Sequence, residues 1–472
     1  MILTLVLFSA MVIAMSVYGV VLPLQLTALV RRFMVGPSVW GAAGVRILLA
    51  ILLWFSAPLS HTPTTFEVIA ILALLSAIVL PLIGTARLLQ LIDRVAFWPP
   101  WIIRCQCLLG VAFGAFLLWS ASPNLKEDAI TETNHNTSVE IGNEVYGASP
   151  DHRGPIGGGE GYANSITGGD YIVEDLDALL DALSKATAGQ VVFIPAETEI
   201  DLTARIYIEQ LVLEVGEGVT LAGERGNNGS KGALLTSDAL KTPIMIRPTG
   251  PNVRITGLRI QGPNPKRYLE HHKRAFGPGG DGSEYYYKFP TSDGIKAEHP
   301  HLEVDNCEIS AFGHAGIYLI KGEGHHIHHN FIHHCQYNGL GYGVSHDTAS
   351  SLIEYNLFDS NRHSIAGTGR PGCSYVARHN IELGVSLSHC FDMHGGRDRK
   401  DGTAIAGTSV EIYNNTFRAP ETAVVIRGVP EDICDVHHNW FVQHDSAADA
   451  VRADEKTKVE NNAYGPQPQQ AQ

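Results

Sequence analysis

The sequence IHHNFI at residues 327–332 decides the fold, because similar phrases recur along the second half of the chain. Each phrase has an apolar or aromatic residue at its first and sixth positions. Most phrases start 23 to 26 residues after the previous one, and two longer steps contain insertions at about 263–290 and 395–408. The phrases begin at Ile255, Val304, Ile327, Ile353, Val376, Ile412, Val436 and Val459.

A repeat of this length has a direct physical meaning. One coil of roughly 24 residues cannot bury its apolar side alone, so coils stack into a solenoid with a shared core. The β-branched, Gly-punctuated phrases favour strands over helices. The fourth position is Asn in five phrases, and we expect each Asn amide to bond the equivalent Asn of the next coil. These residues are Asn330, Asn356, Asn415, Asn439 and Asn462. The repeat predicts an all-β fold, a parallel β-helix.

This stretch resembles the pectin-lyase-like superfamily of right-handed parallel β-helices, over about residues 170–465. The amphipathic segment 172–188, followed by the apolar residues 191–195, resembles the helical N-terminal cap of those folds. Such a cap covers the exposed edge of a solenoid. The superfamily contains lyases, hydrolases, epimerases, esterases and binding proteins, so the resemblance implies a fold rather than an activity.

The first 120 residues differ in composition from the rest of the chain. They contain no Lys, and their only acidic residues are Glu67 and Asp93. A bilayer core about 30 Å thick needs roughly 20 apolar residues per helix. Four stretches meet or approach this length, at residues 1–30, 41–57, 66–84 and 101–120. The sequence predicts a transmembrane region of four helices, which we interpret as an anchor.

The positive charges predict the orientation of this region. The loops after the first and third spans carry Arg31, Arg32, Arg87 and Arg94, whereas the loop at 58–65 has no Lys or Arg. Basic loops stay in the cytoplasm. The following domain is therefore expected outside the cytoplasmic membrane. The predicted order is a transmembrane region at 1–120, a flexible linker at 121–169, a β-helix domain at 170–465 and a tail at 466–472.

The charge of the chain bears on its partners. The net charge of −14 argues against nucleic-acid binding, which usually needs a basic surface. The first insertion is more basic and aromatic, with Lys266, Arg267, Tyr285 and Tyr286, and the second contains Arg397. Cations beside aromatic rings suit an acidic polysaccharide through charge pairing and ring stacking.

A second strand of each coil can be aligned on one inward apolar residue. The residues after it then point outward. This alignment places the small residues Gly341, Gly343, Ala366 and Thr368 in a shallow trough. Polar residues flank the trough on both sides, namely Lys296, Tyr318, Asp392, His394 and Arg427. The alignment uses Ile295, Ile317, Leu340, Ile365, Phe391 and Val424 as the inward column.

Two positions before that column, the alignment places Asn338, His363 and His389 on neighbouring coils. The two imidazoles should stack roughly 4.7–4.9 Å apart. With Asp392 and His394 they form an ionisable cluster, for which three roles stay open. The cluster could supply a catalytic base, it could ligate a divalent metal such as zinc or manganese, or it could be a structural ladder.

The His-rich tract at 325–329 is typical of metal binding by composition. However, Ile327 fits the inward pattern, so the neighbouring His residues alternate between faces, which favours a solvated or ladder role.

The functional prediction is β-elimination on an acidic polysaccharide. This reaction needs a base, for which His363 or His394 is the candidate, with Asp392 orienting it. It also needs a cation to neutralise the uronate carboxylate, for which Arg397, Arg427 or Lys296 is the candidate. The alternative is a non-catalytic module that binds or organises surface glycan with the same residues. No cofactor is predicted, apart from a divalent metal if the cluster of His363, His389, Asp392 and His394 ligates one.

Overall fold

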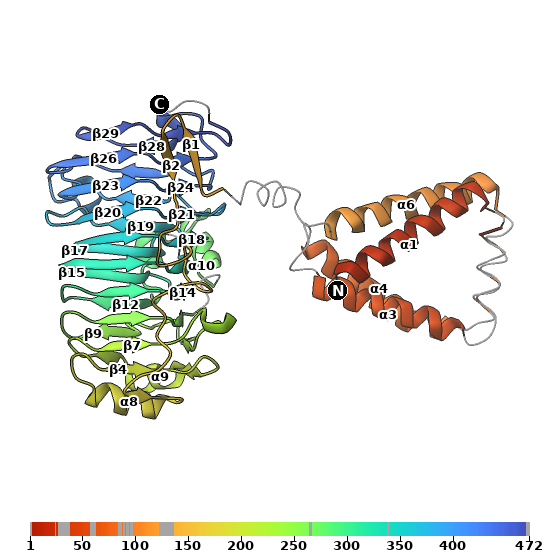
Figure 1. The fold of residues 1–472 in the computed structure, drawn as a ribbon. Coiled ribbons are helices and arrows are strands. Elements are labelled where there is room, and N and C mark those ends of the chain that lie inside the picture. Colours follow the sequence, from red (N-terminus) through yellow and green to blue (C-terminus); the bar gives the residue numbers. More distant parts are fainter. Residues whose placement is uncertain are drawn as a thin grey trace. The chain divides into compact units, whose positions relative to one another are not determined.

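The computed structural model describes residues 2–23, 25–26, 38–56, 63–83, 87, 90, 94, 98–121, 136–263, 267–337 and 339–468. The chain divides into two compact units, Met1–His135 and Asn136–Gln472. Figure 1 shows the first as helices and the second as stacked strands. Each unit is described by itself below.

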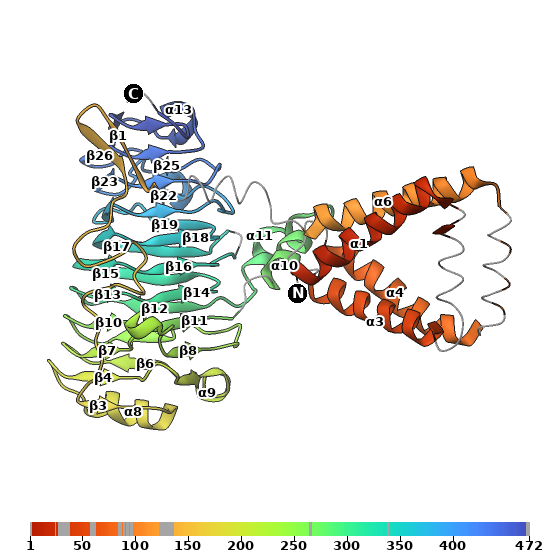
Figure 2. The same ribbon diagram turned by 45° about the vertical axis from the view of Figure 1, so that its right-hand side comes forward.

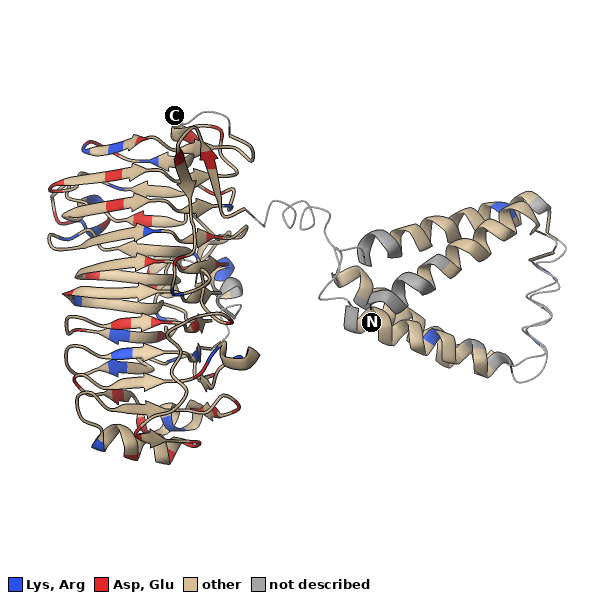
Figure 3. Ribbon diagram, viewed as in Figure 1, with Lys and Arg blue, Asp and Glu red and all other residues tan. Residues whose placement is uncertain are grey.

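The described residues of the first unit include four long helices. They are α1 (Ile2–Val21), α3 (Ser38–Ser56), α4 (Pro63–Ile83) and α6 (Pro100–Ala121). Helix α1 packs against α6, and α3 against α4. By length and composition, one apolar helix in the described residues, Thr64–Ile83, could cross a membrane, and the other apolar stretches are shorter. The helices carry almost no charged side chains, unlike the strands of the second unit (Figure 3).

The second unit is a solenoid with three faces, here called A, B and C. All pairings between successive coils are parallel. Face B is the simplest and forms one sheet of ten strands. Its strands are β5 (Glu199–Asp201), β8 (Leu234–Thr236), β11 (Arg259–Gln261), β14 (Glu308–Ser310), β16 (Phe331–His333), β18 (Leu357–Asp359), β21 (Ile381–Glu382), β24 (Thr416–Phe417), β27 (Trp440–Phe441) and β30 (Ala463–Tyr464).

Faces C and A join through two long strands, β15 (Ala315–His328) and β17 (Tyr342–Glu354), which turn the corner between them. The other strands of face C are β6 (Leu213–Val215), β9 (Ile246–Pro248), β12 (Asp293–Ala297), β19 (His363–Gly367), β22 (Phe391–Met393), β25 (Val424–Ile426) and β28 (Val451–Arg452). The other strands of face A are β3 (Tyr171–Ile172), β4 (Val191–Phe193), β7 (Thr220–Ala222), β10 (Arg254–Thr256), β13 (Glu303–Asp305), β20 (Ser374–Arg378), β23 (Ser409–Tyr413), β26 (Ile433–His437) and β29 (Thr457–Glu460). Figure 2 shows the coils stacked along one axis.

Short helices decorate the coils. Helix α8 (Leu176–Lys185) lies at the N-terminal end of the stack (Figure 2), where it buries Leu179, Ala182 and Leu183. Asp175 caps this helix by accepting a hydrogen bond from the N–H of Ala178. The expected helical cap is therefore present. The remaining helices are α9 (Thr203–Glu209), α10 (Arg267–Phe276), α11 (Gly282–Tyr286), α12 (Gly396–Arg399), α13 (Ala447–Ala450) and the 3-10 turn η2 (Asn227–Gly229).

An Asn ladder runs along the corner between faces A and B, as expected from the repeat. Each Nδ2 donates to the Oδ1 of the next Asn over 2.9–3.1 Å, in the order Asn330, Asn356, Asn380, Asn415, Asn439 and Asn462. Asn380 was not among the expected members. The phrase starting at Val376 is out of register by one residue, because Ala377 pairs with Ile353 and Ile412. The residue before each ladder Asn has a left-handed backbone, with φ between 50° and 54°.

One carboxylate lies in the interior. Glu382 pairs with Phe358 and Phe417 on face B, positions that otherwise point into the core. Its side chain is 1% exposed. Burial raises the pKa of Glu382 to about 8, and the charges of Asp359 and Glu421 add to the rise. Glu382 is therefore protonated at neutral pH.

Residues 136–164, here called the strap, lie against the coils. The strap begins with the antiparallel pair β1 (Ser138–Ile141) and β2 (Glu144–Gly147) beside the C-terminal coils. The Ala148 N–H donates to Thr416 Oγ1 over 2.9 Å, and the Tyr162 hydroxyl donates to Asp305 Oδ2 over 2.9 Å. The strap therefore crosses many coils (Figure 1). The expectation of an extended, flexible linker over 121–169 is wrong for 136–164. Residues 122–135 lie outside the described residues.

Candidate functional site

The register of face C differs from the predicted alignment at one coil. Ile317 pairs with Val344, and Val344 pairs with Ile365, so Val344 and not Leu340 is the inward residue. Gly339 and Gly341 have φ values of 92° and 77° and form a turn before β17 begins. This turn accounts for the shift of four residues between the predicted inward residue, Leu340, and the observed one, Val344. The outward positions of this coil are therefore Ser345 and Asp347, and the trough predicted from Gly341 and Gly343 is wrong.

The predicted contact between His363 and His389 is confirmed. Their ring centroids are 3.9 Å apart on neighbouring coils. Tyr342 takes the place expected for Asn338, which lies outside the described residues, and it stacks on His363 with centroids 5.8 Å apart. His363 Nδ1 donates to the carbonyl oxygen of His389 over 2.6 Å. Since a carbonyl can only accept, the neutral His363 ring has an unprotonated Nε2.

Asp392 is the centre of the cluster and is fully buried. Arg427 binds both of its oxygens, with Nε 2.9 Å from Oδ1 and Nη2 2.8 Å from Oδ2. His389 Nε2 lies 3.1 Å from Oδ1, and His394 Nε2 lies 2.9 Å from Oδ2. His363 Nε2 lies 3.8 Å from Oδ2 and makes no hydrogen bond. The three predicted histidines therefore meet at the carboxylate of the fourth predicted catalytic residue, Asp392, together with Arg427.

The surroundings of the cluster set its charge state. Burial would raise the pKa of Asp392, but the imidazoles of His389 and His394 hold it well below the usual range of a carboxyl. Burial lowers the pKa of His363 to about 2, against the opposing charge of Asp392. Burial also lowers the pKa of His389. At neutral pH the site is an ionised carboxylate beside two neutral imidazoles.

These residues could also hold a metal ion. One ligand atom each of His363, His389 and Asp392 lies within 4.8 Å of the others. Neutral imidazoles with a carboxylate suit a transition metal. However, Arg427 already pairs with both oxygens of Asp392, and its Nη2 lies 3.1 Å from His389 Nε2. A metal here would have to displace a guanidinium.

Two predicted substrate-binding residues lie far along the same face. Lys296 and Tyr318 are neighbours, with Lys296 Nζ 5.2 Å from the ring centroid of Tyr318. The paired strands run in the order β12, β15, β17, β19 and β22, so Lys296 is four coils from Asp392. At roughly 4.8 Å per coil, about 19 Å separates them. Lys296 cannot neutralise a group that reacts at Asp392, which corrects that assignment.

The first insertion does not form the expected aromatic platform. Tyr286 is fully buried and packs on Tyr337, with ring centroids 4.9 Å apart. Tyr285 packs at the edge of the same cluster. Tyr286 therefore cannot stack on a sugar. Arg267 begins α10, and Lys266 lies outside the described residues.

The second insertion lies next to the cluster. Arg397 is exposed in α12, two residues beyond Gly395. Arg427 Nη1 lies 3.6 Å from Asp398 Oδ1 of the same helix. This insertion therefore adds exposed charge near His394.

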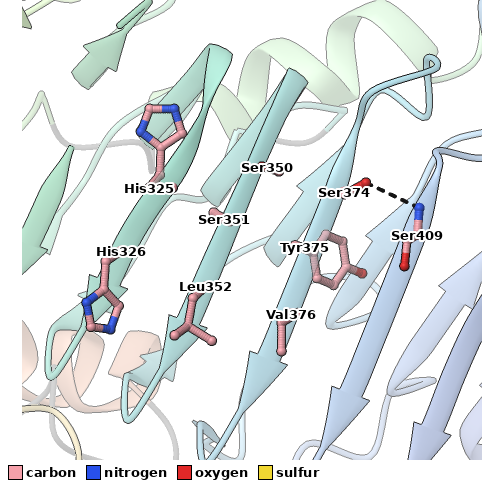
Figure 4. Close-up of a pocket in the computed structure, with 10 residues that line it drawn as sticks. His325, His326, Ser350, Ser351, Leu352, Ser374, Tyr375, Val376 and Ser409 are labelled. Carbon is pink, nitrogen blue, oxygen red and sulfur yellow. Dashed lines mark hydrogen bonds between the residues drawn. The ribbon is translucent and has the colours of Figure 1, made fainter. Parts of the chain in front are cut away.

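A groove that the sequence analysis missed crosses face A. Its volume is about 440 Å³, and its lining includes Ser350, Ser374, Ser409, Leu352 and Val376. Ser350 pairs with Ser374 on the next coil, and the Ser409 N–H donates to Ser374 Oγ over 3.2 Å. Figure 4 shows these residues on neighbouring strands, with His325 and His326 at one side. The signal was present in the sequence, as a Ser three residues before the inward residue of three consecutive coils.

One comparison with known proteins agrees with the fold. The family model described as right handed beta helix region matches residues 288–464. No curated protein matches the chain.

Three solved structures are similar at low identity. An alginate lyase from Paenibacillus sp. str. FPU-7 has a TM-score of 0.30 and 13% identity, over 62% of this chain and 97% of that one. The Dettilon tailspike protein gp208 has a TM-score of 0.36 and 13% identity, over 61% of this chain and 57% of that one. A family 28 exopolygalacturonase from Yersinia enterocolitica has a TM-score of 0.30 and 12% identity, over 64% of this chain and 63% of that one. The coils from β3 to β30 form a right-handed parallel β-helix.

Proposed function

We propose that the β-helix acts on an acidic polysaccharide by β-elimination, at the face C cluster around Asp392. The observation that carries the proposal is the buried, ionised Asp392, which lies within 3.1 Å of His389, His394 and Arg427. Such an arrangement of a carboxylate and imidazoles is typical of sites that orient a base.

His394 is the base in this proposal. Its side chain is 25% exposed, whereas His363 and Asp392 are fully buried. His394 Nε2 makes no hydrogen bond, but the negative charge of Asp392, 2.9 Å away, favours the tautomer with the proton on Nε2, which leaves Nδ1 unprotonated. Nδ1 takes the proton α to the uronate carboxylate. The electrons of that C–H bond form the double bond, the glycosidic C–O bond breaks, and the leaving oxygen takes a proton from water.

Cations beside His394 bind the acidic substrate. Arg397 is exposed, and the Arg427 side chain is 23% exposed. The Arg397 guanidinium can donate paired hydrogen bonds to a carboxylate of the polymer. Arg427 keeps its two hydrogen bonds to Asp392 and contributes its positive charge. Lys296 and Tyr318 lie four and three coils from Asp392, about 19 and 14 Å along the axis, and would contact sugars several units from the reacting bond.

We further propose that α1, α3, α4 and α6 anchor the protein in a membrane, with the β-helix on the extracytoplasmic side. Large apolar side chains on these helices are exposed, including Trp101 at 64% and Leu109 at 72%. Exposed apolar surface of this kind is unusual in a water-soluble unit and suits lipid. Expression with a protease-accessibility assay on intact cells tests the orientation.

The enzymatic proposal is tested by offering the purified full-length protein a panel of uronate polymers and following the absorbance of unsaturated products. His394→Gln should reduce turnover at least 100-fold, because base catalysis is typically worth that much. His437→Gln, at a half-buried imidazole on face A, is the matched control and should leave turnover unchanged. Full activity of His394→Gln would refute the proposal.

A second candidate function is glycan binding without turnover. The serine-lined groove on face A favours it, because small side chains let a chain-like ligand approach the strands (Figure 4). This function predicts saturable binding of a polymer without unsaturated products. It also predicts that Ser374→Trp weakens binding while His394→Gln does not.

A further inference from the structure

A second group of metal-ligating side chains lies on the outer surface of face A. Glu303 on β13 pairs with His326 on β15, and Asp305 pairs with His328. One ligand atom each of Glu303, His326 and His328 lies within 4.8 Å of the others. We propose that Glu303, His326 and His328 bind a divalent transition metal ion.

The strand geometry brings these residues together. His326 and His328 flank the inward residue Ile327, so both point outward. Their ring centroids are 4.1 Å apart. Glu303 reaches them from the preceding coil, with Oε1 3.1 Å from His328 Nε2. The His tract was expected to be solvated or a ladder, but it places two imidazoles close enough to Glu303 for the three side chains to share one ion.

The hydrogen bonds behind His328 limit its protonation. His328 Nδ1 lies 3.0 Å from His329 Nδ1, so one of the two nitrogens must donate. His329 Nε2 is buried and lies 3.3 Å from Asp151 Oδ1. If the proton of His329 is on Nε2, beside this carboxylate, then His328 donates from Nδ1 and its Nε2 is unprotonated. That nitrogen then faces Glu303 Oε1, and a cation between the two removes their repulsion.

His326 is oriented by an outer carboxylate. Its Nε2 lies 2.9 Å from Glu354 Oε1, and Glu354 is held by Arg153 over 2.6 Å and by Arg378 over 2.7 Å. Metal-bound imidazoles commonly donate their other ring nitrogen to a carboxylate in this way, which fixes the ring and strengthens the ligand. The outer partners of a metal centre are therefore in place.

The charge around the group favours a cation. Four carboxylates, Asp151, Glu303, Asp305 and Glu354, face three guanidinium groups, Arg153, Arg254 and Arg378. Arg254 lies 3.8 Å from Oε2 of Glu303, which leaves Oε1 toward the imidazoles. In the Asp392 cluster, by contrast, both carboxylate oxygens contact Arg427.

The ligand set indicates which metal would bind. Two imidazoles and one carboxylate are typical of zinc, whereas calcium prefers six to eight oxygens. Three protein ligands leave a coordination position for water or a ligand. The side chains of Glu303 and His326 are 40% and 30% exposed, and His326 also lines the face A groove (Figure 4). An ion here would be reached from the groove.

Metal binding to the purified full-length protein tests the proposal. After chelator treatment, Zn²⁺ is added and the bound metal is measured by equilibrium dialysis with elemental analysis. Co²⁺ in a parallel sample reports tetrahedral coordination by its visible absorption. We expect a site that is weakened at least ten-fold by His326→Gln and by Glu303→Gln.

Two further variants separate this site from other sources of binding. His437, 3.6 Å from Glu411 on the same face, is the matched control, and His437→Gln should bind as the wild type. His389→Gln alters the Asp392 cluster and should also leave this site occupied. Unchanged binding in both His326→Gln and Glu303→Gln, or loss of the metal in His389→Gln alone, would overturn the proposal.

Discussion

His363 donates its Nδ1 proton to the carbonyl oxygen of His389, 2.6 Å away on the next coil. This bond joins two coils through a side chain and fixes the tautomer of a buried ring. The stack of Tyr342, His363 and His389 is thus held by both ring contacts and a hydrogen bond.

The first prediction concerns that bond. His363→Phe keeps an aromatic ring in the stack but leaves the His389 carbonyl oxygen without this donor. An unsatisfied buried polar group costs about 1–3 kcal/mol, so the free energy of unfolding should fall by that amount in urea titrations. His437→Phe, at a half-buried ring stacked on Tyr413, should change the free energy of unfolding by less than about 1 kcal/mol. An equal fall in the free energy of unfolding for the two variants would contradict a stabilising role for the hydrogen bond from His363 to the His389 carbonyl.

The second prediction concerns the pH dependence from Glu382. Its folded pKa of about 8 lies above its usual value of 4.5, because of burial and the nearby Asp359 and Glu421. Between these pH values the folded state holds a proton that the unfolded state has lost, so stability falls as pH rises. From pH 4.5 to 7 the free energy of unfolding is expected to fall by roughly 3 kcal/mol.

Glu382→Gln should remove this slope, as measured by urea unfolding at several pH values. Glu411→Gln, at an exposed strand position, should retain the wild-type slope. A Glu382→Gln protein with the full wild-type dependence would show that another group is responsible. Cys390, whose pKa is raised by burial and by Glu382, lies beside this carboxyl and titrates only above the tested range.

The third prediction concerns the Asn ladder. Asn380 Nδ2 donates to Asn415 Oδ1 and to the Ile353 carbonyl, and its Oδ1 accepts from Asn356. Asn380→Ala leaves several buried groups without partners and should lower the free energy of unfolding by about 2–4 kcal/mol. Asn164→Ala, at an exposed residue of the strap, should have little effect. Similar midpoints for both variants in denaturant would argue against a stabilising ladder.

The fourth prediction concerns the strap. Gly158 has φ of 65°, and a Cβ there would lie 2.3 Å from the His329 carbonyl oxygen. Gly142 has a similar φ of 67° but has nothing within 4 Å of such a Cβ. Gly158→Ala should detach the strap and expose it to limited proteolysis, read out by mass spectrometry. Gly142→Ala carries the same backbone strain but no steric clash, so it should leave the strap attached and protected from the protease.

Much of the β-helix could be predicted because its repeat is local. The spacing of apolar residues and Asn places successive coils in register without knowledge of distant contacts. Two alignments failed for a shared reason. At Val376 and at Leu340 a second apolar residue lies close by in the sequence, and either one satisfies the pattern. Only the pairing of the strands distinguishes them.

The remaining errors concern contacts that no local pattern encodes. The strap lacks periodic hydrophobicity, and its partners lie far away in sequence, such as Glu354 for Arg153. Tyr286 was predicted to form a surface platform because it shares the first insertion with Lys266 and Arg267, but the aromatic cluster with Tyr337 buries it. The groove on face A was missed because serines in strands carry a weak signal.

The course of the strap has a consequence for the order of folding. Ala148 contacts Thr416, and these partners are 268 residues apart in sequence. During synthesis the N-terminal partner emerges first and must wait until the coil that receives it has been made. Contacts of such high contact order form late, after loop-closure entropy has been lost in stacking the coils. The strap should therefore close over the solenoid as one of the last steps of assembly.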